Sequence, residues 1–251
     1  MKIRPTLAVA LALFLGLTAL ATPGLAAPPE HEEMAPAADE DTPLATRAAA
    51  VLEDQLAEAS NRRVPRNLRE NALCVGVFPS VVKAGFIVAA KRGHGLVSCR
   101  HGETGAWGAP AVFTVSAASV GLQAGIQSAS VVLLFMNEEA VERIATGERK
   151  LAVGVDLDVT AGPVGGTATV DTQPAILSYV RTKGLFAGLN LEGARMGFAP
   201  KINAEHYGAE LSARDILLGG HAAPAALAVF QETLAKYAAG TEPAPAAAPA
   251  P

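Results

Sequence analysis

Apolar residues along the chain first follow a helical period and then a strand period. From Leu44 to Ala59 they recur every three or four positions, with charged residues on the opposite side, which predicts an amphipathic helix. Pro65 favours the start of a short second helix that reaches about Asn71. From Leu73 onwards, short apolar runs are separated by turns, as in a sheet of short strands. Pro79 is expected to end the first run, and residues 93–95 (GHG) are predicted to form a turn.

The uncharged stretch of residues 111–136 is long enough for a transmembrane helix. Its pattern favours strands instead, because apolar residues alternate strictly with Gly or Gln over residues 120–127. Residues 128–130 can form a turn, and residues 131–136 fit a fully buried strand. This stretch is therefore predicted to form two strands.

The second half of the chain also mixes helices and strands. Asn137 is a good N-cap for a helix that Gly147 ends, and alternation over residues 151–159 predicts the next strand. Ser212 caps a short helix, and a final helix is expected over residues 222–239. Because the strands follow one another without crossover helices, we expect an α+β fold. It would have a strongly twisted or barrel-like antiparallel sheet, an N-terminal amphipathic helix and short C-terminal helices.

The two ends of the chain do not have the composition of a folded domain. Residues 1–27 combine a basic start, an apolar run and small residues at candidate cleavage points, which is typical of a secretory signal peptide. Residues 28–43 are a linker rich in Pro, Ala and acidic residues, and residues 241–251 are a Pro/Ala-rich tail. Residues 44–240 remain as one domain of an exported, periplasmic protein.

The predicted export bears on the state of the two cysteines, Cys74 and Cys99. In an oxidising compartment an even pair of cysteines usually forms a disulfide, which is the favoured interpretation here. Two buried thiols are the alternative. The chain has no C-x-x-C motif, so we do not expect a redox role.

Charge argues against one class of function and favours another. The net charge of −4 is unlike that of a nucleic-acid-binding protein, which would show a basic surface. Basic residues nevertheless gather after the amphipathic helix and on nearby turns. Beside an apolar helix face, they are typical of binding to anionic phospholipid headgroups, whereas pairing with neighbouring glutamates would make them a solvated surface. The candidate lipid-binding residues are Arg47, Arg62, Arg63, Arg66, Arg69, Lys83, Lys91 and Arg92.

No catalytic motif stands out in the sequence. There is no G-x-S-x-G nucleophile motif, and the glycine-rich segments match no nucleotide-binding fingerprint. The spacing of His94, Cys99 and His101 fits no standard zinc site. Asp156 and Asp158 could form a carboxylate pair on one strand face, although a solvated face is the simpler interpretation. We expect no enzyme activity, no cofactor and no metal site.

A set of short segments, in a fixed order, carries a family resemblance. The segments are FPSVVKAGF (78–86), GHG (93–95), WGAP (107–110), GLQAGIQ (121–127), LLFMN (133–137), AGPVG (161–165), SY (178–179), GLFAG (184–188), YG (207–208) and DIL (215–217). Together they resemble the SYLF domain, also called the Ysc-type actin-binding domain, over roughly residues 49–219. The resemblance implies a lipid-binding module, since eukaryotic members bind phosphoinositides through basic residues of an N-terminal amphipathic helix and some bind actin filaments. The corresponding region here is residues 44–71, whose amphipathic helix departs from that pattern in being unusually acidic and in lacking lysine.

Three hypotheses follow from the sequence. The first is a non-catalytic module of the bacterial envelope that binds anionic phospholipid at the membrane surface through the basic residues. The second is a structural or interaction module without lipid binding, whose partner is an envelope protein. The third is an unrecognised hydrolase that uses Asp156 and Asp158.

Overall fold

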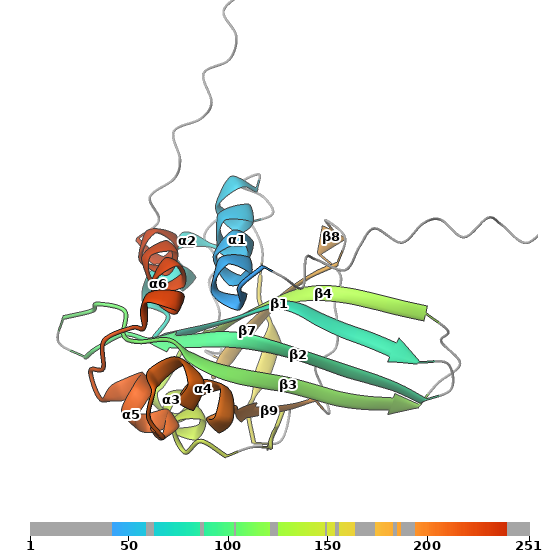
Figure 1. Ribbon diagram of the computed structural model, residues 1–251. Helices are drawn as coiled ribbons and strands as arrows, with labels where there is room; N and C mark the ends of the chain where they lie inside the picture. Colours follow the sequence, from blue (N-terminus) through green and yellow to red (C-terminus); the bar gives the residue numbers. More distant parts are fainter. Residues whose placement is uncertain are drawn as a thin grey trace, which may run out of the picture. The chain divides into compact units, whose positions relative to one another are not determined.

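The computed structural model describes most of the chain between residues 42 and 239 (Figure 1). The predicted signal peptide (1–27), the tail (241–251), Arg62 and nearly all of the predicted linker (28–43) lie outside the described residues. The described ranges are residues 42–58, 63–85, 88–102, 104–120, 125–148, 150–153, 156–163, 174–182, 185–186 and 194–239.

The chain begins and ends with helices and has most of its strands between them, which is the order that the sequence pattern predicts. The helices are α1 (Leu44–Ala57), α2 (Arg66–Asn71), α3 (Glu138–Ala145), α4 (Pro200–Tyr207), α5 (Ala213–Leu218) and α6 (Ala225–Ala238). The strands are β1 (Cys74–Gly85), β2 (Val88–Cys99), β3 (Ala111–Val120), β4 (Gly125–Phe135), β5 (Leu151–Ala152), β6 (Val159–Ala161), β7 (Ile176–Thr182), β8 (Leu185–Phe186) and β9 (Arg195–Phe198).

The strands form one strongly curled sheet, a half-barrel in the order β5-β9-β3-β2-β1-β4-β7-β6, with β8 on the edge of β7 (Figure 1). Neighbouring strands are antiparallel, apart from the parallel pair β6–β7. This confirms the predicted α+β class and the barrel-like sheet. The described part of the uncharged stretch 111–136 contains β3 and β4, and no helix of the described chain has the length and apolarity that crossing a bilayer requires.

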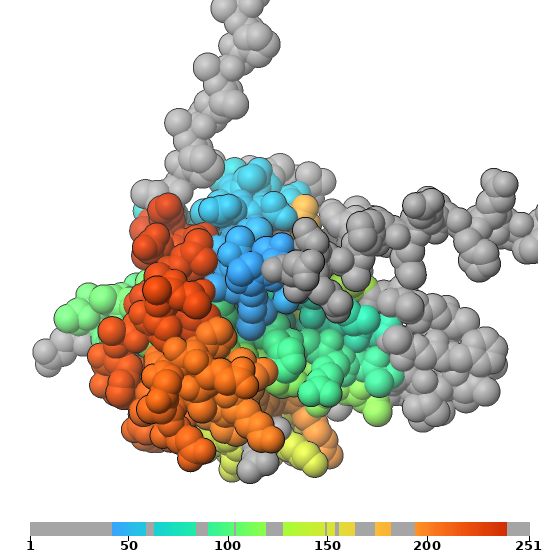
Figure 2. All heavy atoms as spheres, in the orientation of Figure 1, coloured from blue at the N-terminus to red at the C-terminus, as the bar shows by residue number. Residues whose placement is uncertain are grey.

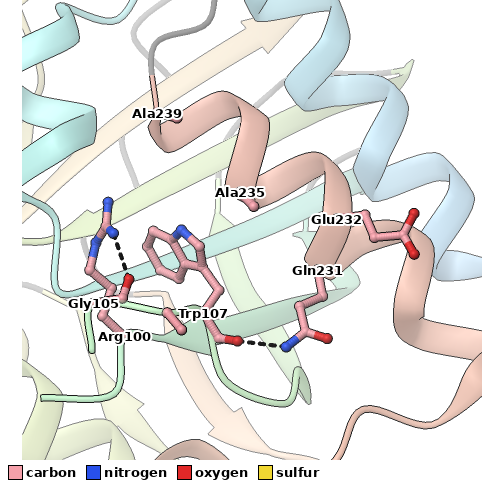
Figure 3. Close-up of a pocket in the computed structure, with 8 residues that line it drawn as sticks. Arg100, Gly105, Trp107, Gln231, Glu232, Ala235 and Ala239 are labelled. Carbon is pink, nitrogen blue, oxygen red and sulfur yellow. Dashed lines mark hydrogen bonds between the residues drawn. The ribbon is translucent and has the colours of Figure 1, made fainter. Parts of the chain in front are cut away.

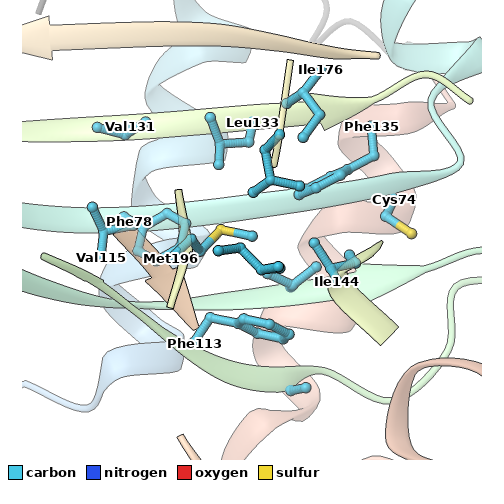
Figure 4. Packing of buried hydrophobic residues seen from close by; sticks show 14 of the residues in the cluster. Cys74, Phe78, Phe113, Val115, Val131, Leu133, Phe135, Ile144, Ile176 and Met196 are labelled. Carbon is cyan, nitrogen blue, oxygen red and sulfur yellow. The ribbon is translucent and has the colours of Figure 1, made fainter. Parts of the chain in front are cut away.

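Two hydrophobic cores pack on the two faces of the sheet because side chains alternate along each strand. On one face, Leu96 and Val132 pack with residues of α1, α2 and α6, and we call this the α1-side core. Figure 2 shows α1 and α6 lying against each other on that side, where the Tyr237 hydroxyl donates to Gln55 Oε1 at 2.8 Å. On the other face, Phe78 packs with residues of α3 and α5, and we call this the α3-side core (Figure 4).

Cys74 and Cys99 lie directly opposite each other at the proximal end of the β1–β2 pair, and the structure joins them by a disulfide. Both residues are buried in the α3-side core. The bond therefore ties the first residue of β1 to the last residue of β2, at the end of the hairpin where α2 leads into the sheet.

The turn predicted at residues 93–95 is wrong, and so is the end of a strand at Pro79. β1 continues through Pro79 with a bulge between Val77 and Val82, and β2 runs straight through the glycines. The glycines serve close packing: a Cβ on Gly95 would lie 2.5 Å from the Val77 carbonyl oxygen. Lys83, Lys91 and Arg92 therefore lie on strands and not on turns.

Two further predictions from local pattern need correction, and one helix was not predicted. Residues 128–130 continue β4 and do not turn. Residues 151–159 do not form one strand, because Asp156 folds back and its Oδ2 accepts from the Ala152 amide at 2.7 Å. Helix α4 is the one that was not predicted, although Pro200 at its first turn and left-handed Gly208 (φ 66°) at its end are ordinary helix signals.

Candidate functional site

The distal part of the sheet lies beyond both cores. β1 and β3 end at this part and β2 and β4 begin there, so that the chain reverses twice at the same end. We call residues 82–85, 88–92, 116–120 and 125–128 the distal sheet. Figure 1 shows these strands running on past the helices that cover the rest of the sheet.

The hydrophobic cores stop at the base of the distal sheet. On the α3 side, the outermost core residues of β1, β3 and β4 are Val81, Val115 and Ala129, with Ala117 packed against them. Beyond these positions the described residues include the half-buried Val82 and Lys83 and the exposed Ala90, Arg92 and Ser116. The distal sheet is thus a place where the protein presents strands without a helix against them in the described part of the chain.

On the α3 side of the distal sheet, two lysines lie directly opposite each other. Lys83 of β1 pairs in register with Lys91 of β2, and both are half-buried. Burial lowers the pKa of Lys91, and the positive charge of Lys83 lowers it further. Like charges directly opposite on neighbouring strands are destabilising. The fold therefore brings two cations together on this face of the distal sheet.

On the α1 side, two arginines lie in one row across three strands. Arg92 of β2 pairs with Ser116 of β3, and Ser116 pairs in turn with Arg195 of β9. The two arginines are exposed and stand about 10 Å apart, two strand spacings. Neither makes a hydrogen bond or ion pair with a described residue, so both guanidinium groups can contact a ligand in solvent.

A third arginine approaches this row from α1, which packs over β1 and β2. Burial lowers the pKa of His94, and the positive charges of Arg92 and Arg47 lower it further. The Nδ1 atom of His94 lies 3.1 Å from Thr114 Oγ1. The Nε atom of Arg47 is buried and has no hydrogen-bond partner within the described ranges. We refer to Arg47, Lys83, Lys91, Arg92 and Arg195 as the distal cations.

Arg63, Arg66 and Arg69 follow α1, and we call them the arginine segment. Their contacts differ from those of the distal cations. Arg63 donates from Nε to the carbonyl oxygen of Glu58, and Arg66 forms an exposed ion pair with Glu70 at 2.6 Å. Arg69 is buried, with only 6% of its surface exposed. It donates to the carbonyl oxygen of Tyr237 at 2.6 Å, and its guanidinium carbon lies 5.0 Å from the centre of that ring.

Two separate basic regions therefore exist. β1 begins just after α2 and carries Lys83 nine residues further along, a rise of about 30 Å in an extended strand. Of the residues proposed from sequence, the structure brings together Arg47, Lys83, Lys91 and Arg92 near the distal sheet. Sequence reasoning missed Arg195 and the proximity of His94, because strand register alone reveals them.

A cavity of about 430 Å³ lies between α6 and the loop that carries Trp107 (Figure 3). Arg100 stacks on the Trp107 ring at 4.4 Å and donates to the carbonyl oxygen of Gly105, while Gln231 donates to that of Trp107. These polar groups are already occupied by the protein's own carbonyls. The cavity therefore offers little recognition chemistry for a ligand.

The carboxylate pair considered for hydrolysis is not assembled as the alternation suggested. Asp156 lies in a turn and accepts the Ala152 amide, whereas Asp158 is exposed just before β6. They do not share the face of one strand. Within the described residues, no group of three His, Cys, Asp or Glu side chains could hold a metal ion.

Comparisons with known proteins place the chain among domains of one kind. Residues 116–237 match the family described as "Ysc84: Las17-binding protein actin regulator". The chain is 33% identical over 162 residues to the human "SH3 domain-containing YSC84-like protein 1", a match that covers 63% of this chain and 47% of the human protein.

Fungal relatives give similar matches. Identity is 32% over 169 residues to "SH3 domain-containing protein PJ696.02" of Schizosaccharomyces pombe, covering 65% of this chain and 39% of the relative. It is 30% over 146 residues to "Protein YSC84" of Saccharomyces cerevisiae, covering 56% and 31%. The chain spans about half the length, or less, of the curated relatives it matches.

Proposed function

Because the chain carries a Ysc84 domain, the SYLF family that its motifs indicated, we propose that it is a non-catalytic module that binds anionic phospholipid at a membrane surface. The distal cations are the proposed binding residues. The observation that carries this proposal is their gathering at one end of the sheet, on both faces, in a chain whose net charge is −4.

Simple electrostatics gives this arrangement a useful affinity. Each Lys or Arg near an anionic membrane surface contributes about 1 kcal/mol, so that five distal cations could supply about 5 kcal/mol. Binding of this kind weakens with salt, because the charges are screened.

The compartment is part of the proposal. The signal-peptide pattern of residues 1–27 would export the chain to the periplasm, where the bacterial envelope supplies anionic phospholipid surfaces. The Cys74–Cys99 disulfide agrees with an oxidising compartment.

A protein partner is the second candidate. The family description names a protein that binds Las17 and regulates actin, so a protein ligand is the function stated for that family. In an exported protein the corresponding partner would be an envelope protein with an acidic surface, bound by the same cations.

Co-sedimentation with vesicles tests the proposal. The protein should pellet with vesicles that contain anionic phospholipid, remain in solution with neutral vesicles, and lose binding as salt rises. Changing Lys83, Lys91 and Arg92 together to Gln should weaken binding about 100-fold, from about 1 kcal/mol for each cation. The control changes the charged residues Lys150, Lys201 and Lys236 to Gln, which removes the same net charge from elsewhere. Equal binding by the two triple variants would overturn the assignment of the site.

A further inference from the structure

We infer that the uncharged end of the distal sheet inserts into the boundary between headgroups and acyl chains of the bilayer. This inference rests on the proposed function and adds to it a second, apolar contact. No charged residue occurs between Lys83 and Lys91, and none occurs from Ala111 to Met136. These uncharged stretches include the ends of β1 and β3 and the starts of β2 and β4.

The strand register shows which residues share the end of the sheet. Val88 of β2 pairs with Val120 of β3, and Ala84 of β1 pairs with Ile126 of β4. Gly85 pairs with Ala89 on one side and with Gly125 on the other. Four strands, about 15 Å across, therefore end together in small or apolar residues.

The backbone pairing permits shallow entry and opposes deep entry. β1 and β2 are paired on both sides up to their ends, so their amide and carbonyl groups can leave water at little cost. Beyond Ser116, β3 has no described neighbour on its outer side, and beyond Ala129 the same holds for β4. Those outer groups need water or headgroups, which limits insertion to the interface.

The distance of Lys83 and Lys91 from the end of the sheet matches the depth of a shallow insertion. Lys83 and Lys91 lie two residues back from the Gly85–Ala89 pair, about 7 Å along the strands. Segments that lie in the interface bury their apolar part about 5–10 Å below the headgroups. With the uncharged end at that depth, the lysines stand at the level of the phosphates.

A pair of valines tests the apolar contact without changing charge. Val88→Ser combined with Val120→Ser should weaken binding to anionic vesicles about tenfold or more while leaving its salt dependence unchanged, since apolar surface and not charge is lost. The control is Val229→Ser, because Val229 is the large apolar side chain of α6 that the described structure shows exposed, at 41%. Circular dichroism confirms that each variant is folded. Wild-type affinity in the double variant would overturn the inference.

Depth provides a second, independent measurement. Val88→Trp places an indole at the end of the sheet, and the native Trp107 is buried at 8% exposure and serves as the internal reference. Vesicles with brominated acyl chains should quench the introduced indole and leave the wild-type emission nearly unchanged. Binding without quenching would refute insertion but keep the proposed function, whereas absence of wild-type binding would refute both. Self-association that the two Val→Ser changes abolish would overturn insertion in favour of a contact between two copies.

Discussion

Arg69 and Arg66 lie three residues apart and have different physical roles. Arg69 is buried, donates to the last turn of α6 and has a pKa that burial lowers, whereas Arg66 forms an exposed ion pair. Arg69→Met should reduce the free energy of unfolding by about 2 kcal/mol, because it removes a charge-assisted bond to a buried carbonyl. Arg66→Gln should cost roughly 0.5 kcal/mol or less. Urea denaturation followed by circular dichroism measures both, and equal effects would contradict the assignment.

The pKa of His94 depends on the charges of the arginines around it. In the free protein its pKa should lie below the usual 6.5, because burial and the charges of Arg92 and Arg47 disfavour the imidazolium. A histidine with a lowered pKa stabilises the fold above pH 6.5, and this contribution is lost as pH falls through its folded pKa. Arg92→Gln should therefore raise the pKa of His94, measured by NMR titration of the imidazole protons. No change on removing that charge would mean that Arg92 does not face His94.

At the scale of residues, the sequence identifies candidate binding residues but does not show which of them lie close together in the fold. Arg92 and Arg47 were selected for their charge, and strand and helix packing brings them near each other. Arg195 was missed because it lies more than a hundred residues from Arg92 in the chain, and only the β2–β3–β9 register makes them neighbours. Arg69 looked equivalent to Arg66 because burial against α6 leaves no signal in local sequence.

At the scale of elements, the close approach of β1 and β2 depends on glycine. A Cβ on Gly95 would lie 2.4 Å from Phe78 Cδ1 and 2.5 Å from the Val77 carbonyl oxygen. Gly95→Ala should therefore reduce the free energy of unfolding by about 3 kcal/mol, since a buried backbone atom cannot move aside easily. Gly102→Ala is the matched control, because nothing lies within 4 Å of its added methyl group. Thermal unfolding of the two variants gives the comparison, and similar melting temperatures would argue against this strand packing.

Element types were more predictable than element limits. The 3.6-residue period of α1 is long enough to identify that helix. The alternation over residues 120–127 correctly indicates strand structure but not its limits, because β3 ends at Val120 and β4 begins at Gly125. The glycines at 93–95 were misassigned because glycine marks both turns and close strand packing, and only the partner strand decides between them. Residues 151–159 alternate correctly for a strand, but Asp156 accepts a backbone amide and ends it early.

At the scale of the folded domain, helices cover both cores and leave the distal sheet uncovered in the described part of the chain. Composition and strand pattern were sufficient for the α+β class and the curled sheet. They could not show that cations far apart in the sequence would meet at the end opposite the Cys74–Cys99 disulfide. That meeting follows from the long β1–β2 and β2–β3 pairs, which carry their ends away from the packed helices.

The most direct test of the distal cations compares them with the arginine segment in one vesicle-binding measurement at fixed salt. Wild type, a Lys83→Gln/Lys91→Gln/Arg92→Gln variant and an Arg63→Gln/Arg66→Gln variant are titrated with anionic vesicles. Three lost cations should weaken binding about 100-fold in the first variant, while the second should bind nearly as well as wild type. Full binding by the first variant together with a large loss in the second would contradict the account and return the site to residues 63–66.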